Sequence, residues 1–382
     1  MKTGTSELFS KIPTQLITTL GCLHDYLIFS DMEHTVAGVQ IYDSLDNVLQ
    51  DVKSRNPEFN IYHEQQDCIA DQESCSEGAN RSHEAWVLDK YKTTHIAGKT
   101  FYMRPNYKWY IFIEADTYVL WPNLVQWLGS LNSSEEHFLG SLMLIGDVGF
   151  AYGGSGYILS QPVLKEFSRI FPTLSGKYDY EAKSHCCGDY IFSVALNETL
   201  GLSVKDIWPK LNTEKPYTLP FGPTHWCGPA VTMHHMSPEE ISSFWEFEGD
   251  FYRSQSTLRE LPRKLSFRDI YNYFVAPKLL DAREDWDNLS DDIHYSKTTT
   301  AKHDSYLSDI EKTAHQSFEN CKITCEANTK CFQFRFHDGT CSISTAFKLG
   351  RARKGYPESD RWMSGWMKPR IQEWIKDIGE CL

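Results

Sequence analysis

Short apolar runs and amphipathic segments alternate over the first 250 residues of the chain. Tyr26 to Asp31 is an apolar run that ends in an acid, and Trp109 to Ile113 is the clearest buried strand. Ala85 to Tyr91 has the pattern of a helix, and Pro122 to Leu128 has that of a helix opened by proline. This alternation predicts an α/β layer structure with a mostly parallel sheet flanked by helices.

A second strand-and-helix unit follows further along the chain. The glycine-rich stretch Gly153 to Gly156 leads into Tyr157 to Leu159, which we expect to be a strand. Ser160 is then in position to cap a helix that carries Pro162 in its first turn. A third helix is expected to begin after Asp189, which sits where a helix N-cap belongs.

The pattern changes after residue 250. Residues 251–304 are charged and aromatic without a clean period, so we expect helices and loops that wrap the first domain. Within them, Lys297 to Lys302 is typical of a linker. Residues 305–382 contain a cluster of cysteines and are predicted to form a separate small domain.

Composition excludes some function classes. The aromatic content of 14% suits a folded protein with ring-lined clefts and argues against disorder. The net charge of −13 argues against a nucleic-acid partner. No apolar run reaches the roughly 18 residues that span a bilayer, and the first residues contain no apolar signal core.

The eleven cysteines nevertheless indicate an oxidising compartment. Cys321 and Cys325 are one helical turn apart and would face the same side, with Cys331 and Cys341 following as partners in a disulfide module. A zinc site is the alternative for these four residues. Further pairing is open: Cys68 and Cys75 can pair within a loop, and the partners of the others are not resolved (Cys22, Cys186, Cys187, Cys227 and Cys381). Four sequons permit glycosylation, at Asn80, Asn132, Asn197 and Asn288.

The acidic triplet Glu114-Ala115-Asp116 is the first candidate site, because it directly follows the apolar strand that ends at Ile113. Ligands of open α/β sheets lie beyond the carboxyl ends of the strands. Two crowded carboxylates repel each other unless a cation or a donor lies between them, and hard oxygen ligands suit Mg²⁺ or Mn²⁺. The alternative is that these acids only cap the strand.

Three further features are candidates, each with a structural alternative. The loop from Gly153 to Gly156 marks a close backbone approach or a tight turn. Asp189 is a catalytic carboxylate or a helix cap. His234 and His235 follow an apolar, strand-like segment and offer imidazole to a metal, unless they are structural.

In their order along residues 2–250, these segments resemble glycosyltransferase family 31. The resemblance is to the Fringe and core 1 β1,3-galactosyltransferase branch, most closely to its fungal members. The specific parts are the acid triplet followed by Thr117-Tyr118 and the stretch from Gly153 to Ser160. Weaker parts are Lys2-Thr3-Gly4, Ile28 to Asp31, Gly188-Asp189 and His234 to Pro238.

The resemblance implies a GT-A fold over residues 1–250 and an inverting transfer from a UDP-sugar, with Mn²⁺ or Mg²⁺ as the metal. By position, Asp116 would bind the metal, and His234 would complete the metal site, with His235 the less favoured choice. Glu114 takes the place of the family's first acid, whereas Ala115 replaces its second. Asp189 falls where the family has its catalytic base.

The remaining positions concern the two substrates. The resemblance places Thr3 and Asp31 near the uridine or ribose, and the loop with Gly153 and Gly154 beside the acceptor. Together with Glu114 and Asp116, the residues Thr3, Asp31, Gly153 and Gly154 make up the expected substrate-binding set. The family also has an apolar strand before Lys2 and a membrane anchor further upstream. We therefore expect a truncated first strand, and contact with a membrane only through an N-terminal anchor that this chain lacks.

The sequence thus predicts a UDP-sugar-dependent hexosyltransferase of the secretory pathway, in the Golgi or endoplasmic reticulum lumen. It would move a hexose or N-acetylhexosamine to a hydroxyl of a glycan or glycoprotein, in a β1,3 linkage. The C-terminal domain resembles a PAN/apple module, which implies the pairs Cys321–Cys341 and Cys325–Cys331. The alternative is a weak or inactive transferase fold that binds carbohydrate or protein through this module.

Overall fold

The computed structural model describes residues 1–68, 75, 80–255, 263–302, 304–355 and 360–381. They form two units, each of which is described by itself. Unit 1 comprises residues 1–213 and 230–263, and unit 2 comprises residues 214–229 and 264–382. The chain therefore leaves unit 1 after Thr213, returns to it at Ala230, and enters unit 2 again at Lys264.

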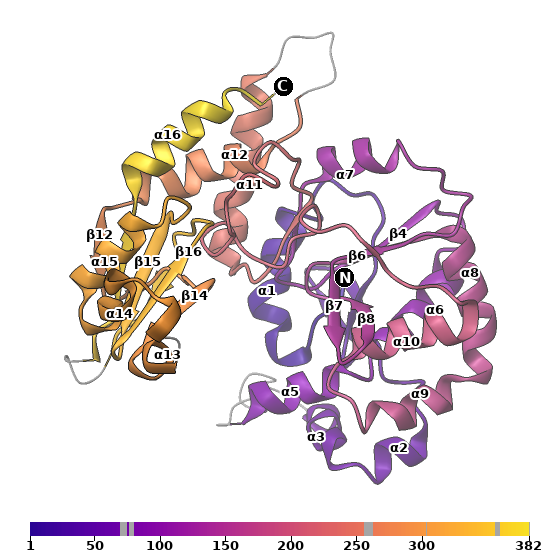
Figure 1. Ribbon diagram of the computed structural model, residues 1–382. Helices are drawn as coiled ribbons and strands as arrows, with labels where there is room; N and C mark the ends of the chain where they lie inside the picture. The colour runs from indigo at the N-terminus through magenta and orange to yellow at the C-terminus, as the bar shows by residue number, and fades with distance from the viewer. Residues whose placement is uncertain (69–74, 76–79, 256–262, 303, 356–359, 382) are drawn as a thin grey trace. The chain divides into compact units, whose positions relative to one another are not determined.

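Unit 1 contains two main sheets (Figure 1). The larger has the strand order β10-β6-β9-β4, and the other has the order β1-β3-β2. Two short pairs complete the unit, β5 with β11 and β7 with β8. The strands of the two main sheets are β1 (Ile28–Ser30), β2 (His34–Val36), β3 (Val39–Asp43), β4 (Trp109–Phe112), β6 (Phe138–Gly140), β9 (Tyr157–Ser160) and β10 (Lys205–Asp206). Those of the short pairs are β5 (Tyr118–Val119), β7 (Leu142–Ile145), β8 (Val148–Ala151) and β11 (Thr232–Met233).

The strand directions are mixed. β1 runs parallel to β3, and β10 runs parallel to β6. β9 is antiparallel to both of its neighbours, β4 and β6, and β2 is antiparallel to β3. Unit 1 is thus a mixed α/β structure, and the expected mostly parallel sheet is not confirmed.

The first residues of the chain connect the two sheets. Lys2 forms parallel bridges to Phe29 of β1 and to Glu114, just beyond β4. Its backbone N–H donates to the carbonyl of Ile113 at 2.8 Å, and that of Thr3 donates to the carbonyl of Phe29 at 2.9 Å. The N-terminal residues therefore lie in the centre of the strand layer, next to the acid triplet.

Both faces of the larger sheet are buried at its central strands β6 and β9, which are apolar at successive positions. On β9, Tyr157 and Leu159 face one apolar cluster, whereas Ile158 faces another. Helices α6, α8 and α10 pack against one another, and α8 contacts β4 and β9 (Figure 1). The helices of unit 1 are α1 (Leu8–Ile17), α2 (Gln50–Ser54), α3 (Asn60–Asp67), α5 (Arg81–Asp89), α6 (Thr93–Met103), α7 (Trp121–Leu128), α8 (Gln161–Ile170), α9 (Ser175–Ala182), α10 (Gly188–Leu200) and α11 (Pro238–Ser254).

The expected helices form, with two changes at their ends. Ser160 is the N-cap residue of α8, but its hydroxyl accepts a hydrogen bond from the backbone of His137 and caps nothing. The N-cap of α10 is Cys187, so Asp189 lies in the first turn of the helix. Asp189 is therefore not the N-cap residue, although its Oδ1 accepts a hydrogen bond from the N–H of Tyr190 in the first turn. No helix within the described ranges is long and apolar enough to cross a membrane.

Unit 2 is built on a five-stranded antiparallel sheet with the order β12-β18-β15-β16-β14. A further pair joins β13 to β17. Its strands are β12 (Ala282–Glu284), β13 (Trp286–Asp287), β14 (Ile293–Ser296), β15 (Gln333–His337), β16 (Thr340–Ser344), β17 (Arg351–Ala352) and β18 (Met363–Trp366). Its helices are α12 (Phe267–Ile270), α13 (Lys297–Lys302), α14 (Asp309–Thr313), α15 (Phe318–Ala327) and α16 (Lys368–Ile378).

The extent of unit 2 differs from the expected domain boundaries. Residues 264–304 are not a wrapping segment, because they supply β12 and β14 at the two edges of the sheet. The expected linker Lys297 to Lys302 is the helix α13. Residues 214–229 also belong to unit 2, where Cys227 is joined to Cys381. The sequence pattern missed these boundaries because edge strands of three or four residues carry almost no periodic signal.

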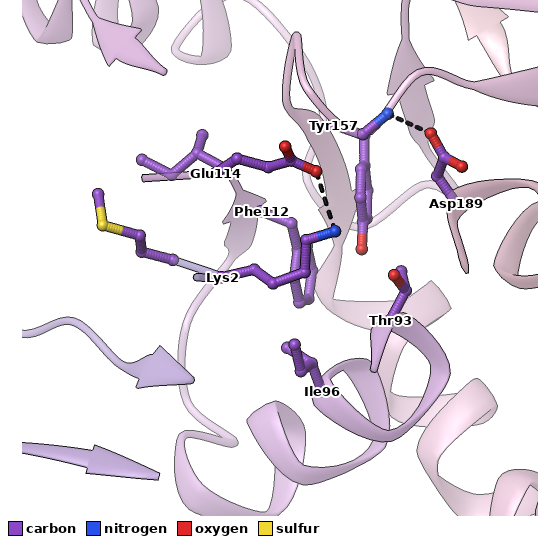
Figure 2. A pocket seen from close by; sticks show the side chains of 10 residues that line it. Lys2, Thr93, Ile96, Phe112, Glu114, Tyr157 and Asp189 are labelled. Atoms are coloured by element: carbon purple, nitrogen blue, oxygen red, sulfur yellow. Dashed lines mark hydrogen bonds and ion pairs between the residues drawn. The ribbon is translucent and has the colours of Figure 1, made fainter. Parts of the chain in front are cut away.

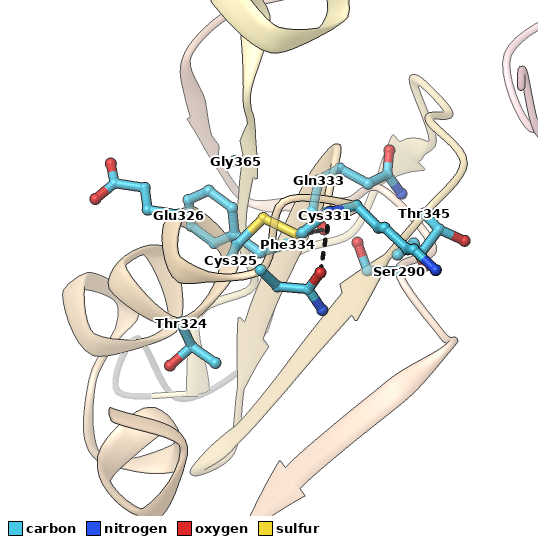
Figure 3. The surroundings of a disulfide bond; sticks show 12 residues. Ser290, Thr324, Cys325, Glu326, Cys331, Gln333, Phe334, Thr345 and Gly365 are labelled. Atoms are coloured by element: carbon cyan, nitrogen blue, oxygen red, sulfur yellow. Dashed lines mark hydrogen bonds between the residues drawn. A yellow bond between two sulfur atoms is a disulfide. The ribbon is translucent and has the colours of Figure 1, made fainter. Parts of the chain in front are cut away.

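Disulfides join the elements of unit 2 in the pairing that the resemblance to a PAN/apple module implies. Cys321 pairs with Cys341, and Cys325 pairs with Cys331. Figure 3 shows how the second bond ties α15 to the segment before β15, and all four cysteines lie in one buried cluster with Phe334. The expected pair Cys68–Cys75 is also present, and the adjacent residues Cys186 and Cys187 are joined to each other.

Candidate metal and catalytic site

The acid triplet leaves β4 in a loop that is held on both sides. The Nε2 atom of Gln15 donates to the carbonyl oxygens of Ala115 and Thr117, at 2.7 and 3.1 Å. The hydroxyl of Thr117 donates to the carbonyl of Gly154 at 2.8 Å. The loop is therefore fixed to α1 and to the glycine loop, which sets the direction of its side chains.

The middle residue of the triplet does not face the site. Ala115 is 1% exposed and packs in an apolar cluster with Leu8, Ile12 and Ile28. The carboxylates of Glu114 and Asp116 instead both approach His234. A carboxylate at position 115 would thus be buried among aliphatic side chains.

His234 follows β11 and brings an imidazole to the triplet. Its Nε2 atom lies 3.2 Å from Oδ1 of Asp116 and 3.8 Å from Oε2 of Glu114. β11 pairs antiparallel with β5, and the N–H of Met236 donates to the carbonyl of Asp116 at 3.0 Å. Backbone pairing thus positions His234 beside Asp116.

The glycine loop allows three catalytic candidates to converge. A Cβ atom on Gly153 would lie 3.2 Å from Oδ2 of Asp189 and 3.3 Å from Oε1 of Glu114. A Cβ atom on Gly154 would lie only 2.1 Å from the His234 ring. A side chain at position 154 would overlap the His234 ring, and the N–H of Gly156 donates to the carbonyl of Gly153 at 2.9 Å, so the loop is both a close backbone approach and a tight turn.

Asp189 lies in the first turn of α10 and lines the same pocket as Glu114. Its Oδ2 accepts a hydrogen bond from the N–H of Gly153 at 2.7 Å, and its Oδ1 accepts one from the N–H of Tyr190 at 2.8 Å. Burial raises the pKa of Asp189 above its usual value, although the hydrogen bond from Gly153 and the charge of Lys2 lower it. A carboxylate with a raised pKa is a better proton acceptor than an exposed one.

The pocket is lined by residues from several segments of unit 1, among them Lys2, Thr93, Glu114, Tyr157 and Asp189. Figure 2 shows the Lys2 ammonium turned toward Glu114, and Asp189 held by its hydrogen bond. The Lys2 and Glu114 side chains are 2.9 Å apart, and Lys2 also pairs with Asp89. Glu114 is therefore already neutralised by a lysine.

Thr3 and Asp31 lie in a buried network beside this pocket. The ammonium of Lys92 pairs with Asp31 and donates to the carbonyl of Thr3 at 3.1 Å. The other oxygen of Asp31 accepts from the N–H of Thr5 at 3.1 Å. The Asp31 side chain is fully buried, so in this structure it orients its neighbours, and contact with a nucleotide stays a prediction.

The electrostatics of the triplet centre on His234. Burial raises the pKa of Asp116, but the hydrogen bond and charge of His234 outweigh it and hold the pKa well below its usual range. Burial lowers the pKa of His234, whereas Asp116 and Glu114 together raise it to about 9. A positive charge is thus favoured between the two carboxylates, which is the charge that a bound divalent ion would also supply.

The donor set fits a metal ion. Asp116, His234 and His235 each offer a ligand atom, and these atoms lie within 4.8 Å of one another. The Nδ1 atom of His234 is buried and has no hydrogen-bond partner among the described residues. Since buried polar atoms in proteins are almost always paired, this nitrogen is available to a ligand such as a metal ion.

Comparison with known proteins adds no assignment. No protein-family model matches the chain, and no curated protein matches it either.

Sequence reasoning overlooked the basic residues around the site. Lys2, Lys11 and Lys92 each pair with an acid of the site or its neighbours, Lys11 with Asp116 at 3.4 Å. A single lysine has no periodic or spacing signal, so the sequence offered no way to find them. Tyr152, whose ring centroid lies 5.6 Å from that of His234, was overlooked for the same reason.

Proposed function

We propose that the chain is a metal-dependent inverting glycosyltransferase that moves a hexose or N-acetylhexosamine from a UDP-sugar to a hydroxyl of a glycan or glycoprotein. The observation that carries this proposal is the convergence of Asp116, His234 and Asp189 around the glycine loop. A metal-binding pair can stabilise a leaving diphosphate, and a separately anchored carboxylate can take the proton of the attacking hydroxyl in a single displacement at a sugar carbon.

Asp116 and His234 would hold the metal, with Mn²⁺ or Mg²⁺ as the expected ion. Bound there, the ion would neutralise the charge that develops on the departing diphosphate. Glu114 is paired with Lys2. It would not bind the ion itself, but its negative charge would stabilise the protonated His234 or the bound ion nearby. Ala115 contributes no ligand because it faces the apolar cluster.

Asp189 would act as the general base. Its two backbone hydrogen bonds fix the carboxylate, and its raised pKa suits proton transfer from an acceptor hydroxyl. Inversion needs one displacement, with the base on the face of the sugar opposite to the leaving group. The attachment of Asp189 to α10, a different element from the triplet loop, is consistent with that separation.

The wider proposal follows the family resemblance. Unit 1 would have a GT-A fold that binds UDP near Thr3 and Asp31, and the linkage formed would be β1,3. The five disulfides of the described residues favour an oxidising compartment, which supports a place in the Golgi or endoplasmic reticulum lumen. Unit 2, as a PAN/apple-like module, would bind the acceptor glycan or its carrier protein.

UDP release tests the proposal directly. The full chain is incubated with Mn²⁺ and, separately, UDP-galactose, UDP-glucose or UDP-N-acetylglucosamine, with and without a panel of glycan acceptors. We expect turnover on one donor, a loss of at least about 100-fold for Asp189→Asn, the typical contribution of a general base, and a similar loss for Asp116→Asn. Asp250→Asn is the matched control, because this aspartate is 71% exposed and outside the site.

The outcomes separate the alternatives. Turnover that is lost in both site variants and kept in Asp250→Asn supports the transferase. No turnover on any donor, together with glycan binding by the intact chain, would favour the alternative of a non-catalytic carbohydrate-binding protein. Turnover that Asp189→Asn retains would refute only the base assignment.

A further inference from the structure

Two consecutive histidines lie on the same side of the chain after β11. Successive side chains of an extended strand point to opposite faces, so His234 and His235 should diverge. Instead their ring centroids are 3.9 Å apart, with 33° between the ring planes. The backbone of His235 has a φ of 58°, in the left-handed region that residues other than glycine rarely adopt. This local conformation is what brings the second imidazole beside the first.

The Nδ1 atom of buried His234 has no hydrogen-bond partner among the described residues, so it is open to a ligand. One ligand atom each from Asp116, His234 and His235 lies within 4.8 Å of the others. Ligands about 2.1 Å from one ion and at right angles are about 3 Å apart, so small side-chain rotations would close the set.

We propose that His235 is a third protein ligand of the metal ion, so that Asp116, His234 and His235 form a two-histidine, one-carboxylate site that selects transition-metal ions over Mg²⁺. This inference rests on the proposed function only in taking Asp116 and His234 as the metal-binding pair. Glu114 is not part of the set, because its nearer oxygen is 3.8 Å from Nε2 of His234, whereas Oδ1 of Asp116 is 3.2 Å from that atom.

The choice of ion follows from the ligand chemistry. Mg²⁺ prefers six oxygen ligands in a near-ideal octahedron, and a second imidazole replaces one of them. First-row transition ions bind imidazole well, and Co²⁺ binds a given set of nitrogen and oxygen ligands more tightly than Mn²⁺. A site with one histidine would discriminate less against Mg²⁺ than a site with two.

Metal titration tests the assignment without turnover. The metal-free full chain is titrated with CoCl₂, MnCl₂ and MgCl₂ by calorimetry, with and without UDP, and the Co²⁺ complex is followed by visible absorption. The variants are His235→Gly and His235→Asn, because both residues tolerate the left-handed backbone. His83→Asn is the control, since His83 is exposed on α5 and belongs to no ligand group among the described residues.

We expect the wild-type chain and His83→Asn to bind Co²⁺ more tightly than Mn²⁺, and Mg²⁺ most weakly. In His235→Gly, the Co²⁺ dissociation constant should rise at least about 10- to 100-fold, which is the cost of losing even an outer partner of a metal ligand. Its absorption spectrum should also change. The metal-free His235→Gly chain should unfold at an equal or higher temperature, because the backbone strain is relieved; a merely structural histidine would instead lower it.

The inference is overturned if both His235 variants bind Co²⁺ with wild-type affinity and spectrum, or if the wild-type chain binds none of the ions with or without UDP. Loss of Co²⁺ binding in the variants of a chain that releases no UDP would support His235 as a ligand while refuting the transferase. Normal UDP release together with unchanged metal binding in the variants would support the transferase and refute His235 as a ligand.

Discussion

Gly154 lies so close to His234 that a single methyl group should disable the metal site. A Cβ atom at position 154 would lie 2.1 Å from Cε1, 2.5 Å from Nε2 and 2.6 Å from Nδ1 of the His234 ring. Carbon atoms in proteins are about 3.5–4.0 Å apart at their optimal contact. In Gly154→Ala, either the ring or the loop must therefore move by more than about 1 Å.

The ring should move rather than the loop. The carbonyl of Gly154 accepts the hydroxyl of Thr117 at 2.8 Å, which ties the loop to the triplet. His234 is 3% exposed, with the ring of Tyr152 and that of His235 as neighbours. A shift of this size breaks the 3.2 Å approach of His234 to Asp116. We expect a loss of about 1–3 kcal/mol in stability, as for other overpacked sites.

Metal affinity is the decisive measurement for Gly154→Ala. Free Mn²⁺ is followed by electron paramagnetic resonance during titration, below the unfolding temperature recorded by circular dichroism. We expect the Mn²⁺ dissociation constant to rise at least about 10-fold, because a ligand is displaced rather than only loosened. Gly222→Ala is the matched control, since its Cβ would lie 3.9 Å from the nearest atom, in ordinary contact. Wild-type Mn²⁺ affinity in folded Gly154→Ala would refute the claim that His234 binds the ion.

Three further changes test other parts of the structure. Burial raises the pKa of Glu248 from 4.5 to about 7, against a hydrogen bond from Tyr118. The folded chain thus binds this proton more tightly than the unfolded chain, and the stability from Glu248 is present below pH 4.5 and lost as the pH rises through 7. In Glu248→Gln, the free energy of unfolding should fall by on the order of 3 kcal/mol less between pH 4 and 8 than in the wild-type chain. An unchanged pH dependence would contradict this. Replacing Cys227 and Cys381 by serine removes a bond between residues 154 positions apart, and should lower the stability of unit 2 by up to about 5 kcal/mol in urea unfolding. An unshifted urea midpoint would show that this bond does not stabilise the unit. Ala115→Asp should lower stability by about 3 kcal/mol or more without tightening Mn²⁺ binding, since the new carboxylate would be buried in an apolar cluster; tighter binding in a stable variant would show that the residue can face the metal.

Much of the strand and helix pattern was predictable because it depends on local signals. The apolar run before Glu114 and the proline in the first turn of α7 and α8 fixed these elements to within a residue or two. The three glycines between residues 153 and 156 indicated a close approach, and the structure identifies its partners as Asp189, Glu114 and His234. Chemistry that is carried by adjacent residues or by glycine spacing is therefore visible in one sequence.

Other features were not predictable because they arise from contacts between distant residues. The antiparallel direction of β9 depends on how the chain returns to the sheet, and apolar content is the same for either direction. The assignment of residues 214–229 to unit 2 depends in part on the bond between Cys227 and Cys381. Lys2 and Glu114 are far apart in the sequence, so no local pattern predicts their ion pair.

The buried position of Ala115 changes how the triplet should be interpreted. A lysine pairs with each acid of the triplet, Lys2 with Glu114 and Lys11 with Asp116, but Asp116 approaches His234 more closely, at 3.2 Å against 3.8 Å, and belongs to the candidate ligand group. A single carboxylate is a weak site for a divalent ion, so the remaining ligands must come from elsewhere. In the proposed metal site, the two neighbouring histidines would supply these ligands, and Gly154 lets the backbone pass close to the His234 ring. One carboxylate of the triplet and the two imidazoles after β11 would then form one ligand set, to which the buried Ala115 contributes nothing.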